Sequence, residues 1–146
     1  MNKKTVSLIL LVTLLLCTVV LSGCGKKSVF KEVASWESAE IQLEITETSR
    51  TGTVTAEGES HSVVISGYYL EAENRWYYCF YDLGKMNGKN INEIKGEEKA
   101  KSAMWVFEAS KKGDTLTLTV IHDYTYARGE SQTDHKGKVY TLKRAE

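Results

Sequence analysis

Apolar and polar residues alternate one by one in separate runs after residue 38, and this alternation limits the fold more than any other feature. In residues 39–45, alanine, isoleucine and leucine alternate with glutamate and glutamine, and residues 115–120 repeat the pattern with threonine, leucine and valine. Successive side chains of a β-strand point to opposite faces, so the alternation predicts strands with one buried face. Polar turns, several of them with glycine, separate these runs. The sequence therefore predicts an all-β domain.

Seven clear runs and one weak stretch predict seven or eight short strands. The clear runs are residues 39–45, 51–57, 61–71, 75–83, 103–109, 115–122 and 138–144. The polar stretch 84–101 is compatible with one weak strand or with a mobile excursion, and a long loop follows at 123–136. Hairpin connections without a long helix predict a small antiparallel up-and-down barrel, with a β-sandwich as the alternative.

An export signal precedes this domain. Lys3 and Lys4 form a short positive start, and residues 5–23 carry no charge. The nearly all-aliphatic run 6–21 would span about 24 Å as a helix, which is short of the roughly 30 Å hydrocarbon core of a bilayer. These features are typical of a cleaved signal peptide rather than of a membrane-spanning anchor.

The end of this signal, Leu21-Ser22-Gly23-Cys24, resembles the lipobox of bacterial lipoproteins at all four positions. The resemblance implies cleavage between Gly23 and Cys24 and attachment of a diacylglyceryl group to the Cys24 sulfur. Two acyl chains give stable membrane anchoring where one is marginal. The implied organisation is a signal peptide at 1–23, a lipidated tether at 24–28 and a β-barrel domain at 29–146. The protein would then lie on the extracytoplasmic face of the cell envelope, held to the lipid bilayer.

The start of the domain combines a weak helical signal with a second resemblance. Phe30, Val33 and Ala34 have the spacing of one helical face, so one or two helical turns are expected there. Trp36 stands at the head of the first strand and Arg144 just after the last apolar residue, which is similar to lipocalin-like barrels. In that family an aromatic residue of the first strand closes one end under a basic side chain from near the C-terminus. The family's usual Gly-x-Trp is replaced here by residues 34–36, Ala-Ser-Trp.

Composition and motifs exclude several functions. The precursor has 19 basic and 19 acidic residues, so removal of Lys3 and Lys4 leaves 17 against 19, a net charge of −2. Without a basic stripe, no nucleic-acid partner is expected. The sequence has no glycine-rich phosphate loop, no Gly-x-Ser-x-Gly and no His-Glu-x-x-His, so we expect neither an enzyme nor a cofactor. His122, Asp123, Asp134 and His135 are possible zinc ligands, but solvated side chains in a polar loop are the preferred interpretation and no metal is expected.

The fourth expected strand has two apolar faces. Trp76, Tyr78 and Phe80 alternate with Tyr77, Cys79 and Tyr81. A closed barrel needs one apolar face per strand, so the surplus face requires a cover: the N-terminal helical turns, the 84–101 excursion, a second subunit or a ligand. Scattered surface tyrosines are the simpler alternative. Cys79, alone in the folded domain, is expected to be buried as a small apolar residue.

Two functional hypotheses follow from these aromatic residues. The first is a binding domain for a small apolar or amphipathic ligand, inside the barrel or at its mouth. The second is an interaction lipoprotein (an envelope assembly factor, inhibitor or immunity-type protein) that uses an exposed tyrosine and tryptophan face. A deep hollow lined by Trp76, Tyr78, Phe80 and Trp105 favours the first hypothesis, and a filled barrel with a flat aromatic patch outside favours the second. The candidate binding residues are Tyr69, Trp76, Tyr77, Tyr81 and Trp105.

Overall fold

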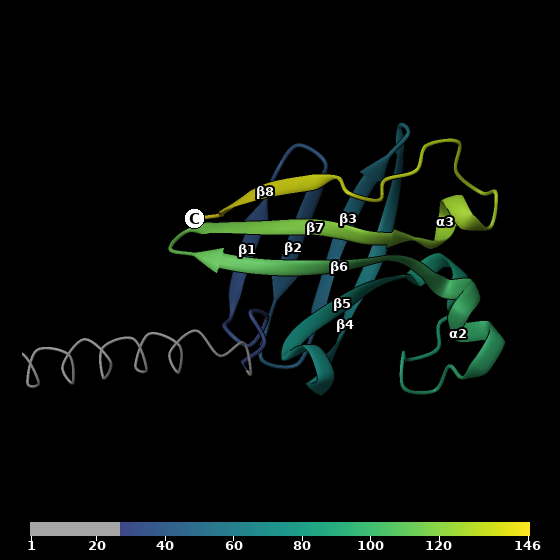
Figure 1. Ribbon diagram of the computed structural model, residues 1–146, viewed down its shortest axis with the longest axis horizontal. Coiled ribbons are helices and arrows are strands. Elements are labelled where there is room, and N and C mark those ends of the chain that lie inside the picture. Colours follow the sequence, from purple (N-terminus) through teal and green to yellow (C-terminus); the bar gives the residue numbers. More distant parts are fainter. Residues whose placement is uncertain (1–26) are drawn as a thin grey trace, which may run out of the picture.

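The computed structural model describes residues 27–146 as a closed barrel of eight antiparallel strands (Figure 1). Each strand pairs with the next in sequence, and β8 pairs with β1. The strands are β1 (Ala34–Glu37), β2 (Ile41–Ile45), β3 (Arg50–Ala56), β4 (Glu59–Leu70), β5 (Arg75–Asp82), β6 (Ala103–Lys112), β7 (Thr115–Asp123) and β8 (Val139–Arg144). This topology confirms the all-β, up-and-down barrel expected from the alternation and decides against a sandwich. The signal, Gly23 and Cys24 lie outside the described residues.

Short helices connect the strands at the ends of the barrel. They are η1 (Glu71–Glu73), η2 (Leu83–Lys85), α2 (Gly96–Ser102) and α3 (Tyr124–Ala127). The expected weak strand in 84–101 is therefore wrong, because this stretch contains α2 instead. Its glutamates stand in the first turn of α2 and its lysines in the last turn, where each favours the helix dipole.

The strand that completes the eight, β1, lies before residue 39. β1 carries Trp36, and a turn closed by a hydrogen bond from the Ser38 N–H to the Ile41 carbonyl (2.8 Å) separates it from β2. The helical turns expected around Phe30 are also wrong. One turn is present at residues 29–30, and Val33 is 57% exposed rather than part of a buried face. Three apolar residues were too few to define a helix, since isolated short helices are marginal.

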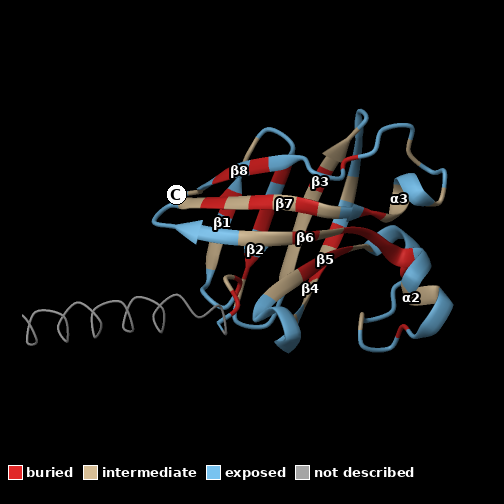
Figure 2. Ribbon diagram, in the orientation of Figure 1, coloured by how far each residue is buried: buried red, intermediate tan, exposed pale blue. Residues whose placement is uncertain are grey.

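Side chains fill the barrel. Figure 2 shows the alternation of buried and less buried positions along β7 and β8. Tyr78, Phe80 and Trp105 are each 1% exposed, and the Phe80 ring centroid lies 6.2 Å from that of Trp105. Tightly packed interiors of this kind leave little room for a ligand. The aromatic residues of the inner faces therefore form a core rather than the walls of a hollow.

Trp36 and Arg144 meet as the resemblance to lipocalin-like barrels implied. They are paired residues of β1 and β8, and the Arg144 guanidinium carbon lies 4.8 Å from the centroid of the Trp36 ring. Trp36 is 2% exposed, and Arg144 also contacts Glu32 (3.2 Å) and Asp114 (3.1 Å). This cation–π contact closes the junction between the first and last strands.

The β4–β5 hairpin pairs incompletely with the rest of the barrel near the start of the chain. β3 pairs with β4 only as far as Thr51 opposite Val64, and β6 pairs with β5 only as far as Phe107 opposite Tyr78. The N-terminal segment 28–30 packs against Tyr78 on the inner side of this end. The Val29 N–H donates to the Tyr78 hydroxyl (3.1 Å), and Phe30 packs edge-on against Tyr78 with a centroid distance of 4.7 Å. Side chains thus close this end of the barrel where backbone pairing stops.

Candidate functional site

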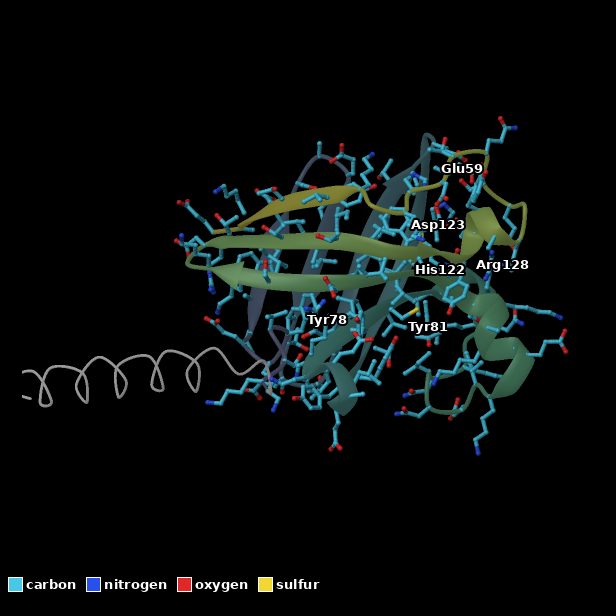
Figure 3. The ribbon with its side chains drawn as sticks, in the orientation of Figure 1. Glu59, Tyr78, Tyr81, His122, Asp123 and Arg128 are labelled. Carbon is cyan, nitrogen blue, oxygen red and sulfur yellow. The ribbon has the colours of Figure 1, made fainter. Side chains whose placement is uncertain are left out.

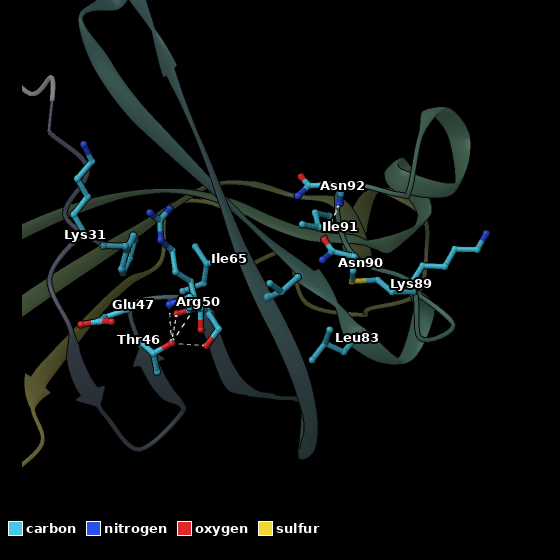
Figure 4. A pocket seen from close by; sticks show the side chains of 15 residues that line it. Lys31, Thr46, Glu47, Arg50, Ile65, Leu83, Lys89, Asn90, Ile91 and Asn92 are labelled. Carbon is cyan, nitrogen blue, oxygen red and sulfur yellow. Dashed lines mark hydrogen bonds between the residues drawn. The ribbon is translucent and has the colours of Figure 1, made fainter.

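A groove of about 660 Å³ crosses β4 at Val64 and Ile65 (Figure 4). The turn between β2 and β3 forms one wall, and the segment that follows β5 forms the other (Figure 4). The lining residues are Phe30, Lys31, Thr46, Glu47, Thr48, Ser49, Arg50, Val64, Ile65, Leu83, Met86, Lys89, Asn90, Ile91 and Asn92. The volume is in the range of sites for small molecules.

The floor of the groove is apolar. Phe30, Ile65 and Met86 are 1%, 4% and 2% exposed, and Phe30 and Ile65 belong to the barrel core. Leu83 and Ile91 continue the apolar surface toward solvent. Because the floor residues are already buried, the apolar area that a hydrocarbon chain removes from water, at about 25 cal/mol per Å², comes mainly from Leu83, which is 39% exposed, and from the half-buried Ile91.

The rim of the groove is polar and basic. Lys31, Arg50 and Lys89 stand against Glu47, so the lining has three positive charges and one negative charge, a net of +2. Lys89 is paired with Glu98 at 3.1 Å. Among the described residues, Lys31 and Arg50 have no ion-pair partner. An apolar floor beside two unpaired cations fits an amphipathic ligand with an anionic head group.

The candidate residues from the inner strand faces lie elsewhere. Trp105 is in the core, stacked on Tyr140 with a centroid distance of 5.6 Å. Trp76 lines a smaller cavity of about 270 Å³ beside Val29 and Tyr78. The indole N–H groups of both tryptophans are buried without a hydrogen-bond partner in the described chain. Tyr69 packs against Trp76 and bonds through its hydroxyl to Asn74. None of these candidates contacts the groove.

The outer face of β5 carries Tyr77 and Tyr81 in two different environments. Tyr77 stacks on Tyr68, which is 50% exposed, at a centroid distance of 5.7 Å, and its hydroxyl bonds to Glu73. Tyr81 is partly shielded from solvent. Burial is the main cause that raises the pKa of its hydroxyl, and the neighbouring Cys79 raises it further. The ammonium of Lys99, from α2, lies 5.8 Å from the Tyr81 ring centroid. The 84–101 excursion thus covers part of the surplus face.

Cys79 is buried between these tyrosines, as expected. Its side chain lies on the outer face of β5 and is 4% exposed in the residue as a whole. Burial raises the pKa of the thiol to about 12. A thiol that stays protonated at neutral pH is a poor nucleophile and a poor metal ligand.

Asp123 and His135 correct the expectation of solvated loop side chains. Both are buried, and the Asp123 carboxylate accepts hydrogen bonds from the His135 ring (2.8 Å), the His135 N–H (3.0 Å) and the Thr125 hydroxyl (2.6 Å). Burial opposes ionisation, but these bonds outweigh it and lower the Asp123 pKa. His122 instead is exposed and packs edge-on against Tyr124 with a centroid distance of 4.4 Å; Figure 3 labels His122 and Asp123 at the end of β7. The hydrogen bonds between Asp123 and His135 join the end of β7 to the loop that precedes β8.

The described part of the chain contains no group of three or more histidine, cysteine, aspartate or glutamate side chains placed to hold a metal ion. Residues 27–146 also contain no helix that is long and apolar enough to cross a membrane. Comparisons with protein-family models, with curated proteins and with solved structures found no match.

Sequence reasoning missed the groove because its lining comes from turns. Ser49 and Arg50 lie in the polar connection between two expected strands, and Met86 and Asn90 lie in the stretch 84–101, for which the sequence predicts a weak strand or a mobile excursion. The one available signal was Ile91 and Ile94, the only large aliphatic residues between Gly84 and Lys101 apart from Met86. An apolar residue in a polar loop indicates a loop that packs back on the domain.

Proposed function

We propose that this chain is a membrane-anchored, extracytoplasmic lipoprotein whose barrel binds a small amphipathic ligand with an anionic head group in the groove across β4. The observation that carries the proposal is the combination of an apolar floor (Phe30, Ile65 and Met86) with the unpaired cations Lys31 and Arg50. The ligand lies on the outside of the barrel because the interior is filled. The aromatic residues of the core then act as a scaffold.

The lipobox at Leu21–Cys24 supports the anchor, and the short tether supports the position of the groove near the membrane. The chain is held in the domain from Ser28 onward, because Ser28 is 7% exposed and bonds to the Tyr78 hydroxyl (3.3 Å). Four residues, 24–27, span at most about 14 Å. Lys31 of the groove rim lies three residues after Ser28, so a lipid on Cys24 keeps the groove close to the bilayer surface.

Ligand binding is tested with dodecanoate, using dodecylamine and dodecanol as probes of equal chain length and different charge. Titration calorimetry of the full chain in a non-ionic detergent is expected to show tightest binding of dodecanoate. Replacing Arg50 or Lys31 with glutamine removes a charged contact, and each change is expected to weaken dodecanoate binding about tenfold. Lys112→Gln, at the end of β6, is the matched control and leaves the affinity unchanged. Equal affinity for all three probes contradicts the proposal.

The anchor is tested separately by Cys24→Ala in producing cells. This change is expected to abolish labelling by radioactive palmitate and to move the protein out of the membrane pellet. Palmitate labelling that persists in the variant contradicts lipidation at Cys24.

The stacked pair of Tyr68 and Tyr77 favours a second candidate function, an interaction lipoprotein. Tyrosine gives large contact area at small entropic cost and is frequent at binding surfaces. A photo-crosslinking residue at position 77 on intact cells is expected to give one discrete adduct with an envelope protein, while the same residue at position 112 gives none. The absence of any adduct at position 77 counts against this function.

A further inference from the structure

Half of β4 has a free edge next to the groove. β3 begins at Arg50 and pairs with β4 only from Glu59 to Val64, whereas β4 continues to Leu70. Residues 65–70 pair with β5 on one side. On the other side no strand of the described chain pairs with them. The backbone N–H and C=O groups of this edge are therefore available to another strand.

The free edge lacks the usual protection against pairing with another chain. Natural edges carry charges, prolines or bulges, but Ile65-Ser66-Gly67-Tyr68-Tyr69-Leu70 contains no charged residue and no proline. Isoleucine and tyrosine also favour strands. Tyr68 and Leu70 are 50% and 37% exposed, so the segment is accessible. An unguarded edge of this kind is suited to strand addition.

We propose that two copies of this chain pair antiparallel along the free edges of β4, about a twofold axis at Gly67. Ile65 then lies opposite Tyr69 of the second copy, and Ser66 opposite its Tyr68. In this register inward-facing residues of one copy lie opposite inward-facing residues of the other, since Ile65 and Tyr69 both pair with inward residues of β5, Phe80 and Trp76. The interface is the same patch on both copies, as closed twofold symmetry requires.

Charge complementarity points to a second copy as the occupant. At the Ile65 end, the free edge meets the unpaired cations Lys31 and Arg50 of the groove rim. At the Leu70 end it runs into η1, whose acidic residues are Glu71 and Glu73. Antiparallel pairing brings the acidic end of each copy to the basic end of the other. Opposite charges thus meet twice, and parallel pairing, which joins like charges, is disfavoured.

The turn that follows β4 combines apolar and anionic side chains, as does the ligand proposed for the groove. Leu70 and Ala72 are apolar, and Glu71 and Glu73 are anionic, so the second copy's turn resembles an anionic amphiphile. This step rests on the proposed function: each turn enters the other copy's groove and competes with the ligand. Self-association then regulates ligand binding, because a ligand in the groove displaces the turn and releases the monomer.

The test is sedimentation velocity of the full chain in a non-ionic detergent across a concentration series. The wild-type chain is expected to dimerise. Ser66→Lys places a charge on the outer side of the free edge and is expected to weaken dimerisation at least about tenfold. Ser62→Lys is the matched control, since Ser62 is an exposed serine of the same strand that is already paired with Thr53 of β3. Circular dichroism verifies that both variants fold.

A charge exchange tests the orientation. Arg50→Glu and Glu71→Lys are each expected to weaken dimerisation about tenfold, and the double variant is expected to restore it. A chain that stays monomeric, a dimer insensitive to Ser66→Lys, or a double variant without restoration overturns the proposal. Dodecanoate is expected to dissociate the wild-type dimer. If the charge exchange succeeds while dodecanoate neither binds nor dissociates the dimer, self-association stands and the proposed ligand function fails.

Discussion

The two ends of the barrel are closed by different means. At the end near residue 27, backbone pairing between β3 and β4 and between β5 and β6 stops early, and Phe30 packs against Tyr78 on the inner side of this end. At the opposite end, polar side chains tie the loops together. Glu57 of the β3–β4 turn accepts hydrogen bonds from the Thr133 N–H (2.7 Å) and the Ser131 hydroxyl (3.1 Å), and Asp123 holds His135.

This difference explains where a binding site can form. Hydrogen bonds between loops have fixed directions, and at the polar end they use the carboxylates of Glu57 and Asp123 to hold the loops rather than to bind a ligand. Apolar packing has no such direction, and at the Phe30 end it leaves an open apolar floor and a free strand edge beside it. The groove begins beside the end with fewer backbone bonds and reaches the segment that follows β5, while a smaller hollow of about 340 Å³ lies at the polar end among Glu57, His61 and His135.

The largest expected effect comes from Phe30→Ala. Phe30 contacts Tyr78 and Phe107 with centroid distances of 4.7 and 6.3 Å, and removal of a buried aromatic ring costs roughly 3–5 kcal/mol of unfolding free energy. Urea denaturation measures it. The matched control is Val33→Ala at an exposed position, expected to change the unfolding free energy by less than about 0.5 kcal/mol. Similar values for the two variants would show that the segment 28–30 does not close the barrel.

Asp123→Ala tests the polar end and has the next largest effect, about 3 kcal/mol, because it leaves buried donors unpaired. Asp134→Ala is the control: Asp134 is exposed, its carboxylate accepts from the Lys136 N–H (3.0 Å), and its loss costs less than about 1 kcal/mol. If Asp134→Ala destabilises as much as Asp123→Ala, the loop rather than the buried carboxylate holds this end.

The contribution of Asp123 also depends on pH in a defined direction. Burial opposes ionisation of Asp123, but the hydrogen bonds from Thr125 and His135 hold its pKa in the folded protein below the ordinary value of an aspartate, so the folded state favours the ionised carboxylate. The stabilisation is fully present above the unfolded pKa and is lost as the pH falls through the folded pKa. The difference in unfolding free energy between the wild type and Asp123→Ala is therefore expected to shrink below about pH 4. A constant difference down to pH 2 would contradict the lowered pKa.

Tyr77 and Tyr81 compare the two ends on one strand, with smaller effects. Tyr77→Ala removes a side chain from the exposed stack with Tyr68 and is expected to shift the melting temperature by less than about 2 °C. Tyr81→Ala removes a half-buried ring beside Cys79 and is expected to cost about 2 kcal/mol. Thermal unfolding followed by circular dichroism measures both. Equal shifts would show that the cover over the outer face does not distinguish the ends.

The smallest expected effect concerns Cys79, where treatment with a reducing agent leaves the stability of the protein unchanged. Reducing agent is expected to leave the melting temperature unchanged, because Cys79 is the single cysteine of the described domain and is not in a disulfide. With its pKa raised to about 12, the thiol is expected to react with a bulky thiol reagent at pH 8 at least about 100-fold more slowly than free cysteine. Labelling of Cys79 in the native protein at the rate of free cysteine would contradict the burial of this thiol.

Period-two alternation determined most of the strands without any tertiary information. In β2, β7 and β8 one face is buried and the other meets water, so the sequence pattern alone locates the strand and its inner face. The motif at Leu21–Cys24 that resembles a lipobox is equally local, and lipidation of Cys24 stays a prediction. The contact of Trp36 with Arg144 followed from a family resemblance and not from the pattern.

Only the tertiary structure decided which apolar side chains are core and where the surface is left open. Tyr78 and Tyr77 are adjacent tyrosines, yet one is 1% exposed and the other joins an exposed stack, because the barrel interior receives alternate residues. The groove depends on where β3 begins, at Arg50, while β4 continues, and no local pattern records that difference. Likewise, Asp123 and His135 stand twelve residues apart in a polar stretch, and only the return of the loop buries them together.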